Sequence, residues 1–217
     1  MSWHRTTQPP AAFVIIGITV LAFFIQNAAF VDILRVFALW PVATPPALAF
    51  GDGVLATGFK PWQLISYGFL HGGWGHLFFN MFAFYMFGLP IERAWGTRRF
   101  VIFYVICLIG AGLVQLLVAG LSGEIYPTIG ASGAVFGILL AFGMMYPNTR
   151  LMLLFPPIPI KAKWFVLGYG ALTLVFGITG TMPGVAHFAH LGGMIFGLGL
   201  ILYWGRQDQR RKMGGWG

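Results

Sequence analysis

Long apolar stretches alternate along the chain with short polar connections. A helix that crosses a bilayer needs roughly 20 mostly apolar residues. The candidate spans are residues 11–30, 69–89, 100–121, 131–146, 164–181 and 185–204. The pattern predicts an all-α polytopic membrane protein in which six transmembrane helices occupy residues 11–204, between an N-terminal segment (residues 1–10) and a basic tail (residues 205–217). We interpret the apolar run at residues 11–25 as the first span and not as a cleavable signal peptide.

Basic residues are divided unevenly between the connections. Of the 13 lysines and arginines, only Arg35 and Lys60 lie in the connections that alternate with the termini. The other set contains Arg5, Arg93, Arg98, Arg99, Arg150, Lys161, Lys163, Arg206, Arg210, Arg211 and Lys212. By the positive-inside rule both termini face the cytoplasm. An even number of spans requires the termini to share a side, so the two predictions agree.

Composition supports the same class. The chain is 58% hydrophobic and only 8% charged, whereas soluble domains are about 25% charged. The net charge of +8 does not predict a nucleic-acid partner, because the basic residues lie between apolar runs and form no single face. The tail from Arg206 is expected to meet anionic membrane lipid. Cys107 is the single cysteine, so no intrachain disulfide is possible.

The connection at residues 31–65 mixes aromatic residues with proline and glycine. An exposed apolar loop of this length is unfavourable in water, whereas tryptophan rings favour the membrane interface. We therefore predict that this first loop lies in the interface.

Polar residues inside apolar spans are costly and usually functional. They are His71, His76, Asn80, Ser132, His187 and His190. In the predicted topology, spans two, four and six all run inward, and these residues lie in the first part of each. They are therefore expected to converge in the outer half of the membrane.

Helical spacing indicates how these residues meet. His76 and Asn80 are four apart and share a helix face, whereas His71 is expected to point elsewhere on the same helix. Gly193 and Gly197 form a G-x-x-x-G pattern that permits close helix packing. Gly133 and Gly137 repeat this spacing on the fourth span. These small residues predict contact between spans four and six near Ser132 and His190.

A serine with a neutral imidazole as its base forms a nucleophile, and its tetrahedral intermediate needs hydrogen-bond donors. His76 and Asn80 offer such donors. No acid is placed to orient His190, since Asp32 and Asp52 lie in the first loop and Glu124 precedes span four. A Ser–His dyad is favoured over a triad.

Other interpretations compete with this one. A membrane serine commonly hydrogen-bonds its own helix backbone, and a histidine can simply bridge two helices. Histidines 71, 76, 187 and 190 could bind zinc, although no His-Glu-x-x-His motif or nearby carboxylate is present. A transporter would place its polar cluster at the midplane instead of near one face.

Several motifs resemble those of the rhomboid intramembrane proteases. The stretch Gly-Ala-Ser-Gly-Ala-Val-Phe-Gly at residues 130–137 resembles the family's nucleophile motif. Ala-His-Leu-Gly-Gly at residues 189–193, followed by Gly197, is similar to its histidine motif. The spacing of His71, His76 and Asn80 is similar to its second-helix signature. Trp62-Gln63 stands where the family often has Trp-Arg. Gln63 in place of the arginine puts the family's anchor of the first loop in doubt.

The resemblance implies a serine endopeptidase that cleaves membrane proteins in or near their transmembrane segments. Ser132 would be the nucleophile and His190 the general base and then acid. His76, Asn80 and the backbone N–H of Ser132 would form the oxyanion site. Phe136 would pack on the catalytic histidine, where relatives often have tyrosine.

The resemblance also implies single-span membrane proteins as substrates, a substrate gate beside span five, and no cofactor or metal. Glu92 with Arg93 resembles a structural ion-pair site of the family. The expected location is the inner (plasma) membrane of a bacterium. The remaining alternative is a non-catalytic rhomboid-like protein that binds membrane clients, although such relatives usually lack the serine or the histidine.

Overall fold

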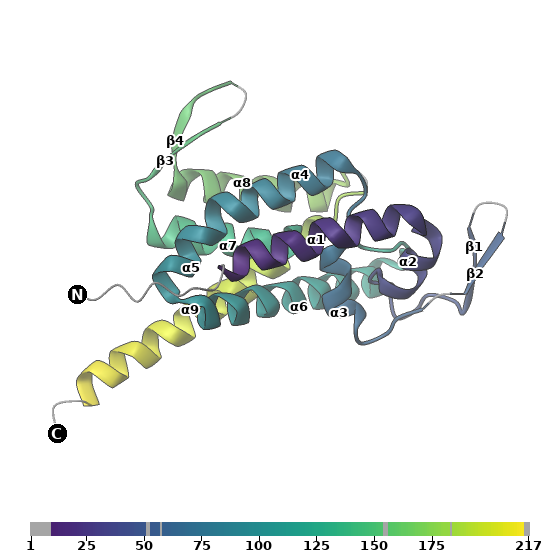
Figure 1. Ribbon diagram of the computed structural model, residues 1–217, viewed down its shortest axis with the longest axis horizontal. Coiled ribbons are helices and arrows are strands. Elements are labelled where there is room, and N and C mark those ends of the chain that lie inside the picture. The colour runs from purple at the N-terminus through teal and green to yellow at the C-terminus, as the bar shows by residue number, and fades with distance from the viewer. Residues whose placement is uncertain (1–9, 51–52, 57, 154–155, 183, 215–217) are drawn as a thin grey trace.

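The computed structural model describes residues 10–50, 53–56, 58–153, 156–182 and 184–214. Most of these residues are helical (Figure 1). The helices among them that are long and apolar enough to cross a membrane are α1 (Ala11–Ala28), α6 (Thr97–Ser122), α8 (Ala162–Thr179) and α9 (His187–Gly214). Helix α7 (Ser132–Met145) is apolar but shorter. The predicted helical membrane fold is confirmed at this level. Most of the predicted N-terminal segment, Asp52 and the last three residues of the predicted tail lie outside the described residues.

The second predicted span is built from three consecutive helical pieces. They are α4 (Trp74–Ala83), the π-helical segment η2 (Phe84–Gly88) and α5 (Leu89–Trp95), which has Pro90 in its first turn. Proline removes a backbone donor, and a π-turn is one way for a helix to accommodate such a break. The helix begins at Trp74 and not at residue 69. The preceding residues form a 3₁₀ turn, η1 (Tyr67–Phe69), and a bend at the Gly72-Gly73 pair.

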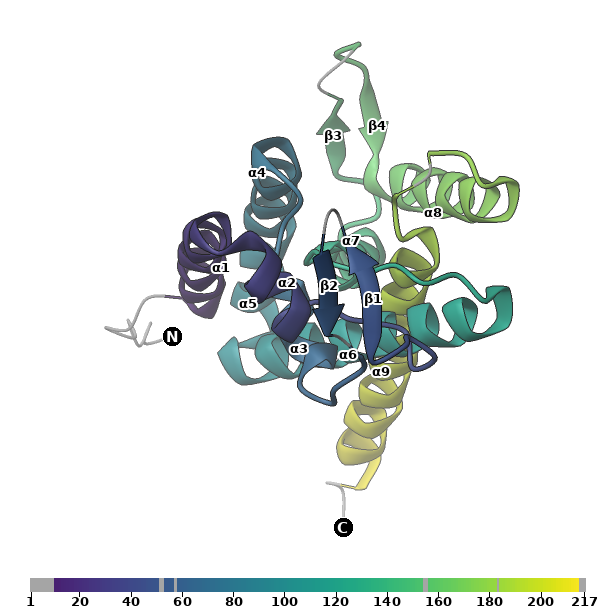
Figure 2. The same ribbon diagram turned by 90° about the vertical axis from the view of Figure 1, so that its right-hand side faces the viewer.

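Helix α7 occupies the centre of the bundle (Figure 2) and packs against α4, α6, α8 and α9. Its sequence is apolar on every face, which is the pattern of a helix that is buried all round. Ala134, Ile138 and Ala141 are completely buried along it. Ser132, at its first residue, is therefore presented by the most enclosed helix of the fold.

Glycines bring α7 and α9 together, as their spacing predicted. A Cβ atom on Gly193 would overlap the carbonyl oxygen of Gly133, and one on Gly137 would lie 2.9 Å from the carbonyl oxygen of Gly193. A Cβ on Gly197 would lie 3.4 Å from the Cα of Gly137. Only hydrogen fits at this crossing, so the two backbones approach directly.

The all-α prediction is wrong for the first loop, which contains two β-strands as well as helices. The loop contains α2 (Phe30–Phe37), the antiparallel strands β1 (Ala47–Phe50) and β2 (Gly53–Ala56), and α3 (Gln63–Ser66). An isolated bridge between Leu39 and Thr128 ties the loop to the segment that leads into α7. Loop one is therefore packed against the part of the chain that positions Ser132.

A second hairpin, β3 (Arg150–Met152) with β4 (Pro159–Lys161), lies toward the opposite end of the molecule (Figure 1). At that end α9 also continues ten residues beyond its predicted limit, into the predicted tail. Arg99 donates two hydrogen bonds to Asp208, of 3.0 and 2.8 Å. This bidentate pair joins the extension of α9 to the start of α6. Hydropathy alone does not predict such a contact.

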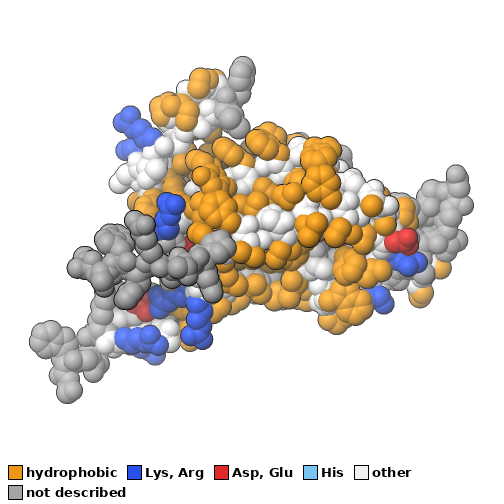
Figure 3. Space-filling view, in the orientation of Figure 1, with side chains coloured by type: hydrophobic (Ala, Val, Ile, Leu, Met, Phe, Trp, Pro, Cys, Tyr) orange, Lys and Arg blue, Asp and Glu red, His pale blue; other side chains and the backbone are white. Residues whose placement is uncertain are grey.

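Hydrophobic side chains form a broad band across the middle of the molecule, and lysines and arginines gather toward the end where α1 begins and α9 ends (Figure 3). Most large apolar side chains of α1 and α8 are exposed. Such a surface is stable in lipid and not in water. The chain is an integral membrane protein that crosses the bilayer more than once.

Candidate active site

The chain changes direction at Gly130, two residues before α7 begins at Ser132. Gly130 has a φ of +123°, which side-chain-bearing residues rarely adopt. A Cβ atom there would lie 2.9 Å from both Cε1 and Nε2 of His76. The Gly130 N–H donates to the carbonyl oxygen of Tyr67 at 2.9 Å. Glycine at this position lets the segment before α7 pass directly beneath the His76 ring.

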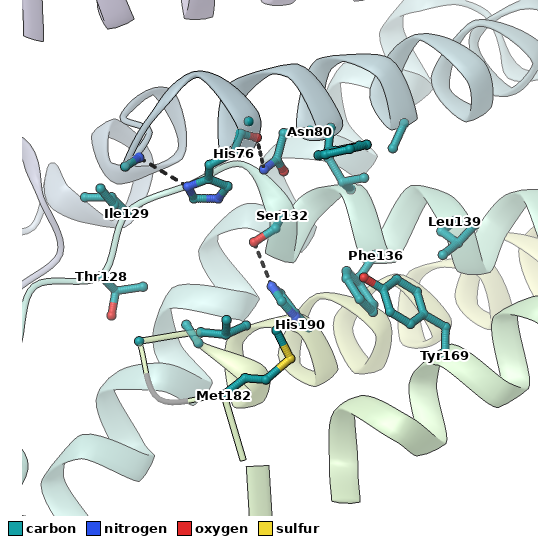
Figure 4. A pocket seen from close by; sticks show the side chains of 18 of the residues that line it. His76, Asn80, Thr128, Ile129, Ser132, Phe136, Leu139, Tyr169, Met182 and His190 are labelled. Atoms are coloured by element: carbon teal, nitrogen blue, oxygen red, sulfur yellow. Dashed lines mark hydrogen bonds between the residues drawn. The ribbon is translucent and has the colours of Figure 1, made fainter. Parts of the chain in front are cut away.

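Ser132 and His190 meet across the α7–α9 crossing. The Oγ of Ser132 and the Nε2 of His190 share a hydrogen bond of 2.7 Å (Figure 4). His190 lies in the first turn of α9, is only 7% exposed and lines a cavity together with Ser132. The hydroxyl is bonded to the imidazole and not to its own helix backbone, which was the competing interpretation of this serine.

Phe136 lies flat on the imidazole of His190. The ring centroids are 4.3 Å apart and the planes differ by 5°. The other ring nitrogen, Nδ1, is buried and has no hydrogen-bond partner among the described residues. Of the candidate acids, Asp32 is exposed and pairs with Arg35 at 3.5 Å. The orientation of His190 in the described structure therefore comes from ring packing and the Ser132 contact.

A cavity of about 740 Å³ opens beside this pair. Its wall includes Ser132 and His190 on one side and His76 and Asn80 of α4 on the other (Figure 4). The rest is mostly apolar, with aromatic rings from α4, η2, α7 and α8. A pocket with a few convergent polar groups on an apolar lining is the usual form of a binding or catalytic site.

His76 has a defined proton arrangement. Its Nδ1 accepts a hydrogen bond of 3.2 Å from the Gly72 N–H, so the neutral ring carries its proton on Nε2. That nitrogen is the one near Gly130, at the entrance to α7. Asn80 donates one amide N–H to the His76 carbonyl oxygen at 2.9 Å. Both side chains thus retain a donor that the described hydrogen bonds do not use.

His71 is not on the same helix as His76, contrary to the expectation from spacing. It precedes α4 and is completely buried, and its ring meets that of His76 edge to face with centroids 4.9 Å apart. Gln26 holds the His71 backbone from both sides: its amide donates to the His71 carbonyl oxygen at 2.8 Å, and its oxygen accepts from the His71 N–H at 2.9 Å. Sequence reasoning missed Gln26, although a glutamine inside an apolar span is itself a signal.

His187 faces away from the Ser132 hydroxyl. Its Nε2 lies 3.1 Å from the carbonyl oxygen of Thr181, and its ring is perpendicular to that of His190. Within the described parts of the chain, no group of three or more His, Cys, Asp or Glu side chains is arranged to hold a metal ion.

Gln63, which departs from the family pattern, is a buried anchor of the first loop. Its oxygen accepts from the backbone N–H groups of Trp40 and Lys60 at 3.3 and 3.1 Å. Its amide donates to the carbonyl oxygens of Val36 and Gly58, both at 3.3 Å. An amide carries both donors and acceptors, so it joins four backbone groups of the loop without a charge.

Glu92 does not form the expected ion pair with Arg93 among the described residues. Its carboxylate instead accepts from the N–H groups of Ala11 and Ala12 at 2.7 and 2.9 Å, and from the Thr97 hydroxyl at 2.8 Å. A carboxylate at a helix N-terminus satisfies free N–H groups and complements the helix dipole. Glu92 therefore caps α1 from a different helix.

Comparisons with known proteins identify the family of this chain. A family model described as the Rhomboid domain matches residues 58–207. The chain is 28% identical to RHOMBOID-like protein 4 of Arabidopsis thaliana, over 98% of this chain and 57% of that protein. It is 24% identical to the rhomboid protease GlpG of Serratia proteamaculans, over 92% and 64% of the two chains, and 29% identical to the rhomboid protease GluP of Bacillus subtilis, over 71% and 28%.

The fold and the surface define a multi-pass membrane protein with a largely apolar cavity that contains a few polar side chains. The match to the family model covers more than half of the chain, so this protein belongs to the rhomboid family. The chain spans about half the length of the curated relatives that it matches.

Proposed function

We propose that this protein is an intramembrane serine endopeptidase that uses a Ser–His dyad. The observation that carries the proposal is the 2.7 Å contact between Ser132 Oγ and His190 Nε2 at the wall of a cavity that also contains His76 and Asn80. A hydroxyl bonded to a neutral imidazole nitrogen is the arrangement that activates serine as a nucleophile.

In the proposed reaction, Ser132 Oγ attacks the carbonyl carbon of a peptide bond while His190 Nε2 takes the hydroxyl proton. The oxyanion that forms would be stabilised by the Nε2–H of His76, the amide of Asn80 and the backbone N–H of Ser132. His190 then gives its proton to the leaving amine, and an acyl-enzyme remains. Water, deprotonated by His190, hydrolyses that ester and restores the serine.

The proposed substrates are single-span membrane proteins. The cavity is lined mostly by apolar and aromatic side chains, which suits a segment that arrives from lipid. A helix hides its carbonyl groups in internal hydrogen bonds, so a segment must unwind locally before Ser132 can reach a peptide bond. Family relatives named as proteases support the activity, and the site residues here support it for this chain.

We further propose six membrane crossings: α1, the continuous path from α4 to α5, α6, α7, α8 and α9. The beginning of α1 and the end of α9 point toward the same end of the molecule (Figure 1), and the basic residues concentrate there. These observations support cytoplasmic termini, a membrane domain at residues 11–204 and, for a bacterial host, the inner membrane.

The test is labelling by a fluorophosphonate probe, which reacts with activated serines. Purified wild-type protein in detergent should be labelled, whereas Ser132→Ala should not be, and His190→Ala should react at least about a thousandfold more slowly. Ser122→Ala, which removes an exposed serine, is the matched control and should label normally. Absence of wild-type labelling would favour the non-catalytic, client-binding alternative, and normal labelling of His190→Ala would exclude the dyad.

A further inference from the structure

Three aromatic rings from three different helices pack one against the next beside Ser132. Phe136 of α7 stacks on His190 of α9, and Tyr169 of α8 packs on Phe136 with ring centroids 4.8 Å apart and planes inclined by 31°. Figure 4 shows Phe136 between the other two rings. The series runs from the proposed base to a helix whose surface is largely exposed.

We propose that Tyr169 is a positioning residue for His190. Its ring holds Phe136 against the imidazole and so keeps Nε2 directed at Ser132. The inference rests on the proposed function and extends it to a residue that does not itself touch the reacting atoms.

The need for such a contact follows from the surroundings of His190. In serine hydrolases with a triad, a carboxylate bonded to Nδ1 fixes the imidazole. Here Nδ1 is buried without a hydrogen-bond partner among the described residues. The neighbouring ring of His187 is 6.1 Å away and perpendicular, so it meets the imidazole by an edge. Face-to-face packing by Phe136 is the closest aromatic restraint on His190, and Tyr169 restrains Phe136.

The position of Tyr169 also couples the dyad to α8. Tyr169 lines the same cavity as Ser132, and it is 43% exposed because α8 lies at the edge of the bundle. A displacement of α8 away from α7 would remove the support behind Phe136. The imidazole of the proposed base would then be held less firmly.

The hydroxyl of Tyr169 offers a different explanation that an experiment can separate. A role through the hydroxyl would be lost in Tyr169→Phe, whereas a role through ring packing would be retained. Tyr169→Leu removes the ring and keeps an apolar side chain, and Tyr169→Met serves if the leucine variant does not fold. Trp164→Leu is the matched control, because Trp164 is an exposed aromatic residue of α8 outside the cavity lining.

The experiment measures the rate of fluorophosphonate labelling at several probe concentrations, with thermal unfolding measured in parallel. We expect the maximal labelling rate of Tyr169→Leu to fall about two- to tenfold, the rate equivalent of one aromatic pair contact. The half-saturating probe concentration should change much less than the rate, because the small probe reacts at Ser132 and needs only part of the cavity that Tyr169 also lines. Tyr169→Phe and Trp164→Leu should both be labelled at the wild-type rate.

Wild-type rates in a folded Tyr169→Leu variant would overturn the proposal. So would an equal loss in Tyr169→Phe, which would assign the effect to the hydroxyl, or in Trp164→Leu, which would assign it to general loosening of α8. These results differ from failure of the proposed function, in which the wild type would not label or Ser132→Ala would label equally.

Discussion

Helices α1 and α8 both lie at the edge of the bundle, yet they are attached to it by different means. Only 22% of the residues of α1 and 17% of those of α8 are buried, against 44% in an apolar 18-residue stretch of α6, so neither helix is held by extensive packing. Helix α1 is fastened by buried polar side chains at both ends. Glu92 caps its N-terminus, and Gln26 near its C-terminus binds the His71 backbone.

Among the described residues, backbone hydrogen bonds join the start of α8 to the segment after α7, from Ala162 N–H to Thr149 at 2.8 Å and from Lys163 N–H to Pro147 at 3.2 Å, but no side-chain hydrogen bond joins α8 to another helix. Its side-chain hydrogen bonds stay near its own C-terminus, where the Thr179 hydroxyl bonds to Val175 and Thr181. Its side-chain contacts with the bundle are packing contacts, such as Val166 against Gly143, Gly170 against Met194 and the ring of Tyr169 against Phe136. Hydrogen bonds to charged or buried groups fix geometry, whereas apolar contacts in lipid are only weakly directional. From this comparison we expect α1 to be a fixed support for the site and α8 to be displaced more readily.

The largest effect should come from removing the cap on α1. Glu92→Ala leaves two N–H groups and a hydroxyl without their charged acceptor, and Ala12 is completely buried. We expect a loss of about 2–4 kcal/mol in the free energy of unfolding. Denaturant titration in micelles would measure it, with Arg93→Ala at the exposed neighbouring position as the control. Equal stability of the two variants would show that α1 needs no polar attachment.

A smaller effect should follow at the other end of α1. Gln26→Leu keeps the size of the side chain but leaves the buried N–H and carbonyl groups of His71 without partners. The expected loss is about 1–3 kcal/mol. Fluorophosphonate labelling should also slow, because the His71 ring packs on His76.

Asn27→Leu provides the matched comparison for Gln26→Leu. Among the described residues, the Asn27 amide donates only to the Phe23 carbonyl oxygen of its own helix, so its loss should change stability by less than about 0.5 kcal/mol. If both variants lose the same stability, the effect belongs to the helix and not to the link with His71.

Hydropathy and residue spacing correctly predicted the features that depend on burial in lipid and on close packing of small residues. The boundaries of α7 differ by one residue from the predicted span, because an apolar helix in lipid begins and ends where polar residues begin. The approach of α7 and α9 followed from Gly133, Gly137, Gly193 and Gly197, since small residues at that spacing have one main use in membrane helices. The pairing of Ser132 with His190 followed from the same contact.

Other features of the fold could not be predicted from hydrophobic periodicity, because they depend on contacts between residues far apart in the chain or on local turn signals. The role of Glu92 was misassigned because its partners are the backbone N–H groups of a helix about 80 positions away. The hairpin of β1 and β2 had a local signal, the Gly51-Asp52 pair between two apolar runs. That signal was missed because the loop was judged by its aromatic content. Tyr169 had no signal, since an aromatic residue in an apolar span is ordinary until the facing helix is known.

The smallest effect should come from adding a methyl group to an exposed position of α8. A Cβ atom at Gly168 would meet no atom within 4 Å, so Gly168→Ala adds a methyl group toward open space. We expect unchanged labelling and either unchanged stability or a gain of up to about 1 kcal/mol from the better helix propensity of alanine. Gly170→Ala on the same helix places its methyl group 3.1 Å from the flexible end of Met194 and should be only slightly less favourable. A loss above about 1 kcal/mol in Gly168→Ala would mean that this face of α8 is packed in the membrane, and α8 would then be as firmly held as α1.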